Sequence, residues 1–109
     1  MSAPLNVLLM REGAYWVAQC LQFDIAVQGK TLAEAQYLFG QTIAARLLVG
    51  REMGIEALCT LPAAHPHYWS LWREALRVEA TSEPTFRLDA PGSVTTDAPQ
   101  CEMRIDKAA

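Results

Sequence analysis

The sequence predicts a single α+β domain with a three- or four-stranded antiparallel sheet, a helix packed on one face, a second helix and a C-terminal β-hairpin. Two observations carry this prediction. Residues 15–54 read as two strands and a capped helix, with apolar spacing that changes from alternation to steps of three and four. The 109 residues are 51% hydrophobic and 19% charged, which suits one folded core and argues against disorder.

Three short apolar runs, at 6–11, 15–20 and 25–28, predict the first three strands. Gly13 lies between the first two runs, where a hairpin turn favours glycine, so we expect these strands to be antiparallel neighbours. Asp24, between the second and third runs, is expected at an exposed bend.

The second strand has two different sides, because neighbouring side chains point to opposite faces of a sheet. We expect one side to face the helix, and the other, which includes the polar Gln19, to be less buried. The helix-facing side holds Trp16, Ala18 and Cys20, and the other side holds Tyr15, Val17 and Gln19.

The first helix is expected to begin at Thr31, because Thr31 and Glu34 have the spacing of a capping box. Gly50 and Gly54 are candidates for its end. One face must cover the sheet, and it holds Leu32, Ala35, Phe39, Ile43 and Leu47.

The stretch 15–35 contains aromatic-x-Val-Ala-x-Cys, a Phe-Asp bend, a Gln-Gly-x-Thr turn and Leu-x-Glu-Ala at the helix start. This order resembles the HicB family of antitoxins, over residues 5–54. Leu21 stands where members often have proline, and Lys30 where they often have an acidic residue. The likeness is carried by Tyr15, Val17, Ala18, Cys20, Gly29, Thr31, Glu34 and Ala35.

The resemblance implies a small α+β domain that binds and masks a small ribonuclease toxin, HicA. Family members also have a separate C-terminal DNA-binding region. We expect no such region here, because the sequence shows no pair of closely spaced helices after Pro66.

The second half of the chain divides at residue 80, with a helix region at 55–80 and the last strands within 81–109. Pro66 suits the first turn of a helix, which we expect to run to about Ala80. Segments 85–89 and 101–106 alternate as half-buried strands and are expected to form the hairpin. Between them, residues 90–100 are expected to be a loop.

The second helix carries more aromatic surface than a small core needs. Its apolar stripe includes Tyr68 and Trp72, with Trp69 at the border. Because Trp and Tyr are enriched at binding hot spots, one of them is expected either to contact another chain or to lie along the surface of its own chain. Together with the less buried sheet side, this gives four candidate partner-binding residues: Tyr15, Val17, Trp69 and Trp72.

Catalytic and metal sites are not expected. A metal nuclease needs converging carboxylates, but Glu12 lies in a turn and Glu34 is explained by the capping box, which leaves only Asp24. His65 and His67 flank a proline and make only two zinc ligands, to which Cys59 would have to be added. No nucleotide or phosphate motif is present, so we expect no cofactor and no enzymatic activity.

The net charge and the cysteines bear on two further properties, DNA binding and the compartment in which the protein works. The net charge is −3, with nine basic residues scattered among twelve acidic ones, so specific DNA binding is not expected. The odd number of cysteines, Cys20, Cys59 and Cys101, favours free thiols in the reducing cytoplasm. Neither a secretory signal nor a membrane span is expected.

The sequence therefore predicts a cytoplasmic, HicB-like protein-binding module. It would bind a HicA-like toxin, or be a stand-alone relative with another protein partner. Two alternatives stay open, a metal-dependent ribonuclease of degenerate ribonuclease H type and a purely structural homo-oligomer. We also expect a homodimer or larger assembly, because short strands leave a sheet edge open.

Overall fold

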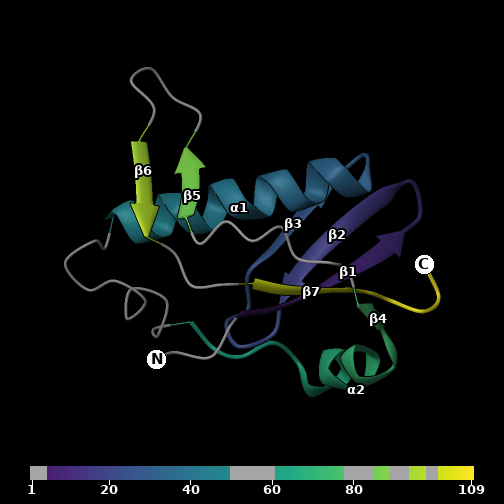
Figure 1. The fold of residues 1–109 in the computed structure, drawn as a ribbon. Coiled ribbons are helices and arrows are strands. Elements are labelled where there is room, and N and C mark those ends of the chain that lie inside the picture. Colours follow the sequence, from purple (N-terminus) through teal and green to yellow (C-terminus); the bar gives the residue numbers. More distant parts are fainter. Residues whose placement is uncertain (1–4, 50–60, 78–84, 89–93, 98–100) are drawn as a thin grey trace.

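The structure, a computed structural model, describes residues 5–49, 61–77, 85–88, 94–97 and 101–109 (Figure 1). Two helices and seven strands lie in these ranges. In chain order they are β1 (Leu5–Glu12), β2 (Tyr15–Cys20), β3 (Ala26–Gly29), α1 (Leu32–Val49), α2 (Pro66–Glu74), β4 (Leu76–Arg77), β5 (Thr85–Leu88), β6 (Val94–Asp97) and β7 (Cys101–Ile105).

Five strands form the main sheet, in the order β3-β2-β1-β7-β4. β1, β2 and β3 are successive antiparallel neighbours, and the β1–β2 turn places Gly13 at a φ of 59°, as expected for a hairpin glycine. β7 runs parallel to β1 and antiparallel to β4. The predicted α+β class is confirmed, but the sheet has five strands and is mixed rather than wholly antiparallel.

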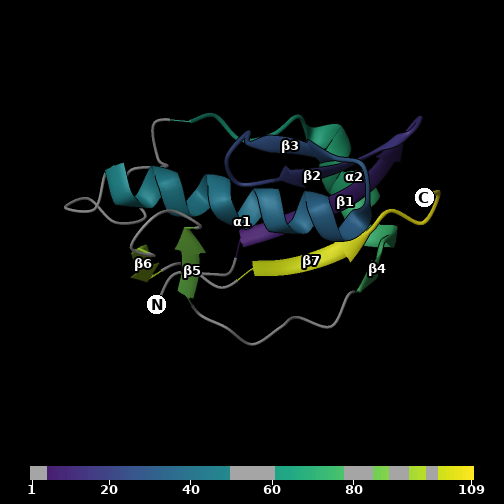
Figure 2. The same ribbon diagram turned by 90° about the horizontal axis from the view of Figure 1, so that it is seen from above.

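The sheet is covered on both faces. Figure 1 shows α1 along one side and α2 beneath the other, and Figure 2 shows the sheet between them. Alternate residues of β1 serve the two faces: Val7 and Leu9 belong to the cluster under α1, whereas Leu8 and Met10 belong to the cluster under α2. All four are buried, so β1 is the central strand of the molecule.

The predicted capping box at the start of α1 is present. Thr31 Oγ1 accepts a hydrogen bond from the Glu34 backbone N–H at 3.0 Å, and Glu34 Oε1 accepts one from the Lys30 backbone N–H at 3.3 Å. Gly29 lies directly under this first turn, since a Cβ added to it would be 2.5 Å from the backbone nitrogen of Ala35. Gly50 and Gly54, the expected end of the helix, lie outside the described residues.

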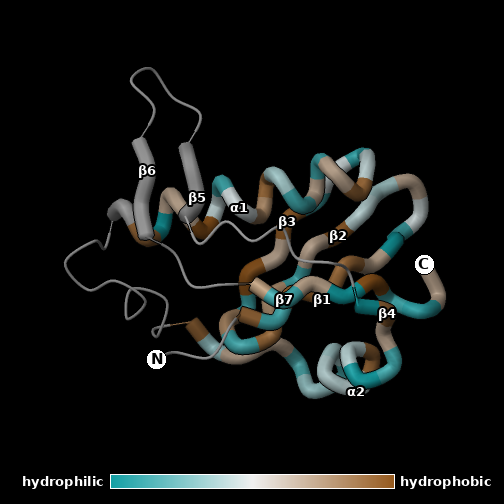
Figure 3. The backbone as a smooth tube through the Cα atoms, in the orientation of Figure 1, coloured by the Kyte–Doolittle hydropathy of each residue, from teal (hydrophilic) through white to brown (hydrophobic). Residues whose placement is uncertain are grey.

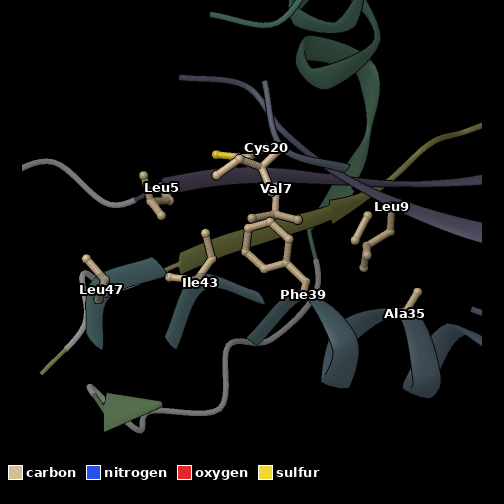
Figure 4. Close-up of a cluster of buried hydrophobic side chains, with 10 residues drawn as sticks. Leu5, Val7, Leu9, Cys20, Ala35, Phe39, Ile43 and Leu47 are labelled. Atoms are coloured by element: carbon tan, nitrogen blue, oxygen red, sulfur yellow. The ribbon is translucent and has the colours of Figure 1, made fainter. Parts of the chain in front are cut away.

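The sheet-facing side of α1 is the predicted one. Figure 3 shows apolar and polar segments alternating along this helix. Figure 4 shows Ala35, Phe39, Ile43 and Leu47 pointing at the strands. The α1 cluster consists of these four with Leu5, Val7, Leu9, Ala18, Cys20 and Ile25.

The other side of β2 is not the less buried one that Gln19 had indicated. Val17 is 7% exposed and Gln19 is 4% exposed, because α2 covers this face. The amide of Gln19 is satisfied there, since its Nε2 donates to the Cys20 carbonyl and to Asp24 Oδ1, both at 2.9 Å. Gln19 is therefore a buried polar residue with hydrogen-bond partners, and its presence did not indicate a solvent-facing side of β2.

The second helix is shorter than expected. It begins at Pro66 as predicted, but it ends at Glu74, and Ala75 is extended with a ψ of 154°. Leu76 and Arg77 then pair with β7, so the backbone leaves the helix to complete the sheet. Leu76, which lies within the range expected to be helical, is therefore an exposed strand residue.

The predicted hairpin between 85–89 and 101–106 is wrong in its pairing. β5 pairs instead with β6, which lies inside the segment expected to be a loop. β7 adds to the main sheet beside β1, where its alternate residues Cys101, Met103 and Ile105 pack against the α1 cluster. That burial gives β7 a reason to pair with β1 rather than with β5.

Candidate protein-binding surface

The four predicted partner-binding residues all lie on the α2 side of the sheet, but they differ in exposure. Val17 and Trp72, which is 6% exposed, are buried together in the α2 cluster with Leu8, Met10, Leu21 and Ala64. They pack against this chain's own core and have almost no surface left for a partner. Sequence reasoning placed them outside because it left this sheet face without a cover.

Trp69 and Tyr15 retain accessible surface. Trp69 is half-buried and packs at the border of the α2 cluster. Tyr15 is 46% exposed at the start of β2, two residues before Val17 and therefore on the same side of the sheet. These two aromatic residues keep accessible surface on the α2 side of the sheet, and we call them the aromatic border.

A polar network that sequence reasoning missed fixes α2 to the sheet. The Arg104 guanidinium lies over the Trp72 ring at 4.4 Å from its centroid, and its Nη1 donates to the Trp72 carbonyl at 3.1 Å. Arg104 Nε also pairs with Glu102 Oε2 at 2.9 Å, and the other Glu102 oxygen pairs with Arg77 at 3.0 Å. The alternation of Glu102 and Arg104 along β7 was the available signal.

Arg104 therefore has two effects on Trp72. It stacks on the ring, and it donates a second hydrogen bond to the Trp72 carbonyl, which also accepts from the Ala75 backbone N–H at 3.2 Å. Glu102, which is only partly exposed, neutralises the guanidinium at this position. The network positions α2, and through α2 it positions Trp69.

The two histidines have a structural role at the start of α2. His65 is the N-cap residue, and its Nδ1 accepts a hydrogen bond from the His67 backbone N–H at 3.1 Å. Both side chains are exposed. Cys59, the possible third zinc ligand, lies outside the described residues.

The three carboxylates considered for a nuclease do not form a site. Glu12 ends β1 next to the β1–β2 turn, Asp24 accepts from Gln19 beyond the far end of β2, and Glu34 belongs to the capping box. Five or more strand residues separate Glu12 from Asp24, which is on the order of 17 Å. The described ranges contain no group of three His, Cys, Asp or Glu residues that could hold a metal ion.

The two described cysteines are free thiols, as predicted. Burial raises the pKa of the Cys20 thiol. Burial and, to a smaller extent, the charge of Cys20 raise the pKa of Cys101 to about 12. Since the thiolate is the nucleophile, both residues are unreactive near neutral pH and serve as apolar packing groups.

Comparison of the chain with protein-family models, with curated proteins and with solved structures finds no match. Among the described helices, none is long and apolar enough to cross a membrane.

Proposed function

We propose that this protein is a HicB-like binding module that binds and masks a small ribonuclease of the HicA kind, or a stand-alone relative with another protein partner. The observation that supports the proposal is the corner formed by β2, β3 and the first turn of α1. Four of the residues that carry the resemblance meet there, with Gly29 under Ala35 and Thr31 bonded to Glu34.

The corner supports the proposal because each of its motif residues has a geometric reason. Gly29 is required, since any side chain would collide with the backbone of Ala35. Ala18 and Cys20 are small enough to lie beneath α1 and are fully buried there. A β-β-β-α unit with a helix across one face is the arrangement that the resemblance implies.

The aromatic border, Tyr15 and Trp69, is the partner surface that we propose. It combines accessible aromatic area with an attachment to the sheet, because Trp69 belongs to a helix that Trp72 and Arg104 hold there. Replacing Trp69 with Ala is expected to cost about 2 kcal/mol of association, as for an interface anchor, while changing the monomer fold little.

The test uses the product of the neighbouring reading frame, which the proposal expects to be a small, basic, HicA-like toxin. Co-expression is expected to relieve its growth arrest and to block its RNA cleavage with purified proteins. Trp69→Ala and Tyr15→Ala should each weaken the complex in calorimetry. The matched control is Tyr37→Ala, because Tyr37 is similarly exposed, at 49%, on α1 rather than on the α2 side.

Two results would contradict the proposal. One is a neighbouring protein that shows neither toxicity nor binding to this chain. The other is a complex that the Tyr37 variant weakens as much as the Trp69 variant, which would move the partner surface to α1. If Trp69→Ala unfolds the protein as readily as Phe39→Ala, then Trp69 is a core residue.

A further inference from the structure

The chain just before α2 is fastened to the turn between β2 and β3. The Asp24 backbone N–H donates to the Pro62 carbonyl at 2.6 Å, and the Ala64 backbone N–H donates to the Leu21 carbonyl at 3.0 Å. Ala64 is also buried in the α2 cluster. These contacts fix the backbone up to the residue before His65, so His65 enters α2 from a defined position.

His65 caps α2 with an imidazole. N-cap positions favour Ser, Thr, Asp and Asn, whose side-chain oxygens remain acceptors near neutral pH. At α2 the acceptor is His65 Nδ1, which lies 3.1 Å from the His67 backbone nitrogen. A backbone N–H can only donate, so Nδ1 carries no proton in this bond and the ring proton is on Nε2. The cap therefore exists only while His65 is neutral.

A proton added to His65 would oppose α2 in two ways. It would turn Nδ1 into a donor that faces another donor, so the capping hydrogen bond would be lost. It would also place a positive charge at the N-terminal end of the helix dipole, 6.5 Å in ring centroids from the second imidazole, His67. Both imidazoles are exposed, so water screens the charge, and the lost hydrogen bond is the larger effect.

The groups around this cap do not offset the added charge. The first turn of α2 contains no acidic residue, and Tyr68, whose ring centroid is 5.6 Å from that of His67, brings no carboxylate. The β2–β3 turn contributes Asp24, which accepts a hydrogen bond from Gln19 Nε2 at 2.9 Å. Within the described ranges, neither imidazole forms an ion pair with a carboxylate.

The other charged groups of the elements packed on α2 lie away from its N-terminal end. Those of β1 are at the end of that strand away from the β2–β3 turn, Arg11 and Glu12. Those near the C-terminal end of α2 come from the helix itself, from β4 and from β7: Arg73, Glu74, Arg77, Glu102 and Arg104.

We infer that protonation of His65 loosens the first turn of α2, so that α2 opens more often in mildly acidic solution while α1 stays in place. The chain has two histidines, both at this cap, and histidine is the side chain that ordinarily changes charge between about pH 5 and 8. Trp69 lies one helical turn after His65, so the opening also moves one residue of the aromatic border. The inference goes beyond the proposed function and does not rest on it, since it concerns the isolated chain.

Amide hydrogen exchange at about pH 7 and about pH 5.5 measures the opening of each helix. Comparing observed with intrinsic exchange rates gives protection factors, which removes the direct effect of pH on exchange. The protection factors of α2 are expected to fall about fivefold at the lower pH, the size expected for a lost N-cap bond. Those of α1 are expected to stay the same, because Thr31 caps α1 with a hydroxyl.

Three variants separate the proton from the cap itself. His65→Asn supplies an N-cap acceptor that takes up no proton in this range, so α2 should be equally protected at both pH values. His65→Ala removes the acceptor, so α2 should be less protected at both, again without a pH dependence. His67→Asn is the matched control, because it removes the other imidazole but keeps the backbone N–H that donates to His65, and it should retain most of the change.

Equal protection of α2 at both pH values in the unaltered protein would overturn the inference. So would a pH dependence that survives in His65→Asn, or one of equal size in α1 and α2. Should His65→Asn fail to fold, as judged by circular dichroism, His67→Asn decides the question, since His65 is then the one histidine left. Its imidazole and the α2 amide resonances should titrate with the same midpoint, and two separate midpoints would contradict the inference.

Discussion

The two faces of the central sheet hold their helices in different ways. On one face, α1 spans 18 residues and contributes fully buried Phe39 and Ile43 to a continuous apolar layer. On the other, α2 has nine residues and contributes one buried side chain, Trp72, with half-buried neighbours around it. Arg104 adds a contact with the Trp72 ring and a hydrogen bond to the Trp72 carbonyl, which attach α2 to β7.

This difference shows how a small domain can combine a stable face with an adaptable one. Many interlocking apolar contacts make α1 inseparable from the sheet, because removing any part of them opens a cavity. A single aromatic anchor with an arginine makes α2 a unit that can loosen locally. A partner at the aromatic border would therefore bind the more adaptable of the two faces.

The largest effect is expected for Phe39→Ala. Its ring lies at the centre of the α1 cluster and is inaccessible to solvent, so truncation leaves a cavity that costs about 4 kcal/mol of folding free energy. Urea denaturation measures this loss. Tyr37→Ala, two residues away and exposed, is the control, and an equal loss in both variants would contradict the assigned core.

Trp72→Ala is expected to cost about 3 kcal/mol and to act mainly on α2. Amide hydrogen exchange should accelerate in α2 while the amides of α1 keep their protection. Arg104→Met should have the same pattern with a smaller loss, because the apolar ring contact survives without the hydrogen bonds. Uniform acceleration in both helices would show that the two faces are equally coupled to the sheet.

Gly29→Ala should cost about 2 kcal/mol, because the new methyl group overlaps the backbone of Ala35 and the first turn of α1 must shift. Thermal unfolding provides the measurement. Gly13→Ala is an instructive comparison: nothing lies within 4 Å of its Cβ, so any loss there reflects the positive φ alone. A neutral Gly29→Ala would mean that α1 is less closely seated than described.

The smallest effect near neutral pH is expected from Cys101. Burial raises the pKa of the Cys101 thiol to about 12 in the folded state, above the 9.0 of an unperturbed cysteine, so the fold favours the neutral thiol. The contribution of this neutral thiol to the free energy of unfolding is fully present below pH 9 and is lost as the pH rises toward 12. Unfolding measured along this range should show a steeper loss of stability for the unaltered protein than for Cys101→Ala, and parallel curves would contradict the burial of the thiol.

The α1 face was predictable from the sequence because its signals are local. The capping pair Thr31 and Glu34 and the spacing of Phe39 and Ile43 lie within one segment, so no distant partner has to be known. The α2 face depends on contacts between distant segments. The residues near Val17 in the sequence do not indicate that Trp72 packs in the same cluster. The apolar stripe identified α2 as an amphipathic helix, but it did not identify the surface that α2 covers.

The prediction of the last strands from the sequence was limited in the same way, because their pairing depends on distant segments. Alternation along 101–106 correctly predicted a half-buried strand, but alternation reports exposure and not the identity of the neighbouring strand. β6 was missed because its segment is rich in turn-forming residues, which outweighed its three β-branched residues, Val94, Thr95 and Thr96. Of the four predicted partner-binding residues, Tyr15 and Trp69 have accessible surface, whereas Val17 and Trp72 are buried in the core.

The parallel pairing of β1 with β7 has a consequence for biosynthesis. β1 is the middle strand of the sheet, yet Leu5 finds its neighbour Cys101 only after nearly the whole chain has left the ribosome. Until then a nascent hairpin of β1 and β2 presents a bare edge next to Leu8 and Leu9, the kind of surface that chaperones shield. Because long-range pairing is slow, the centre of this sheet would be the last part to close.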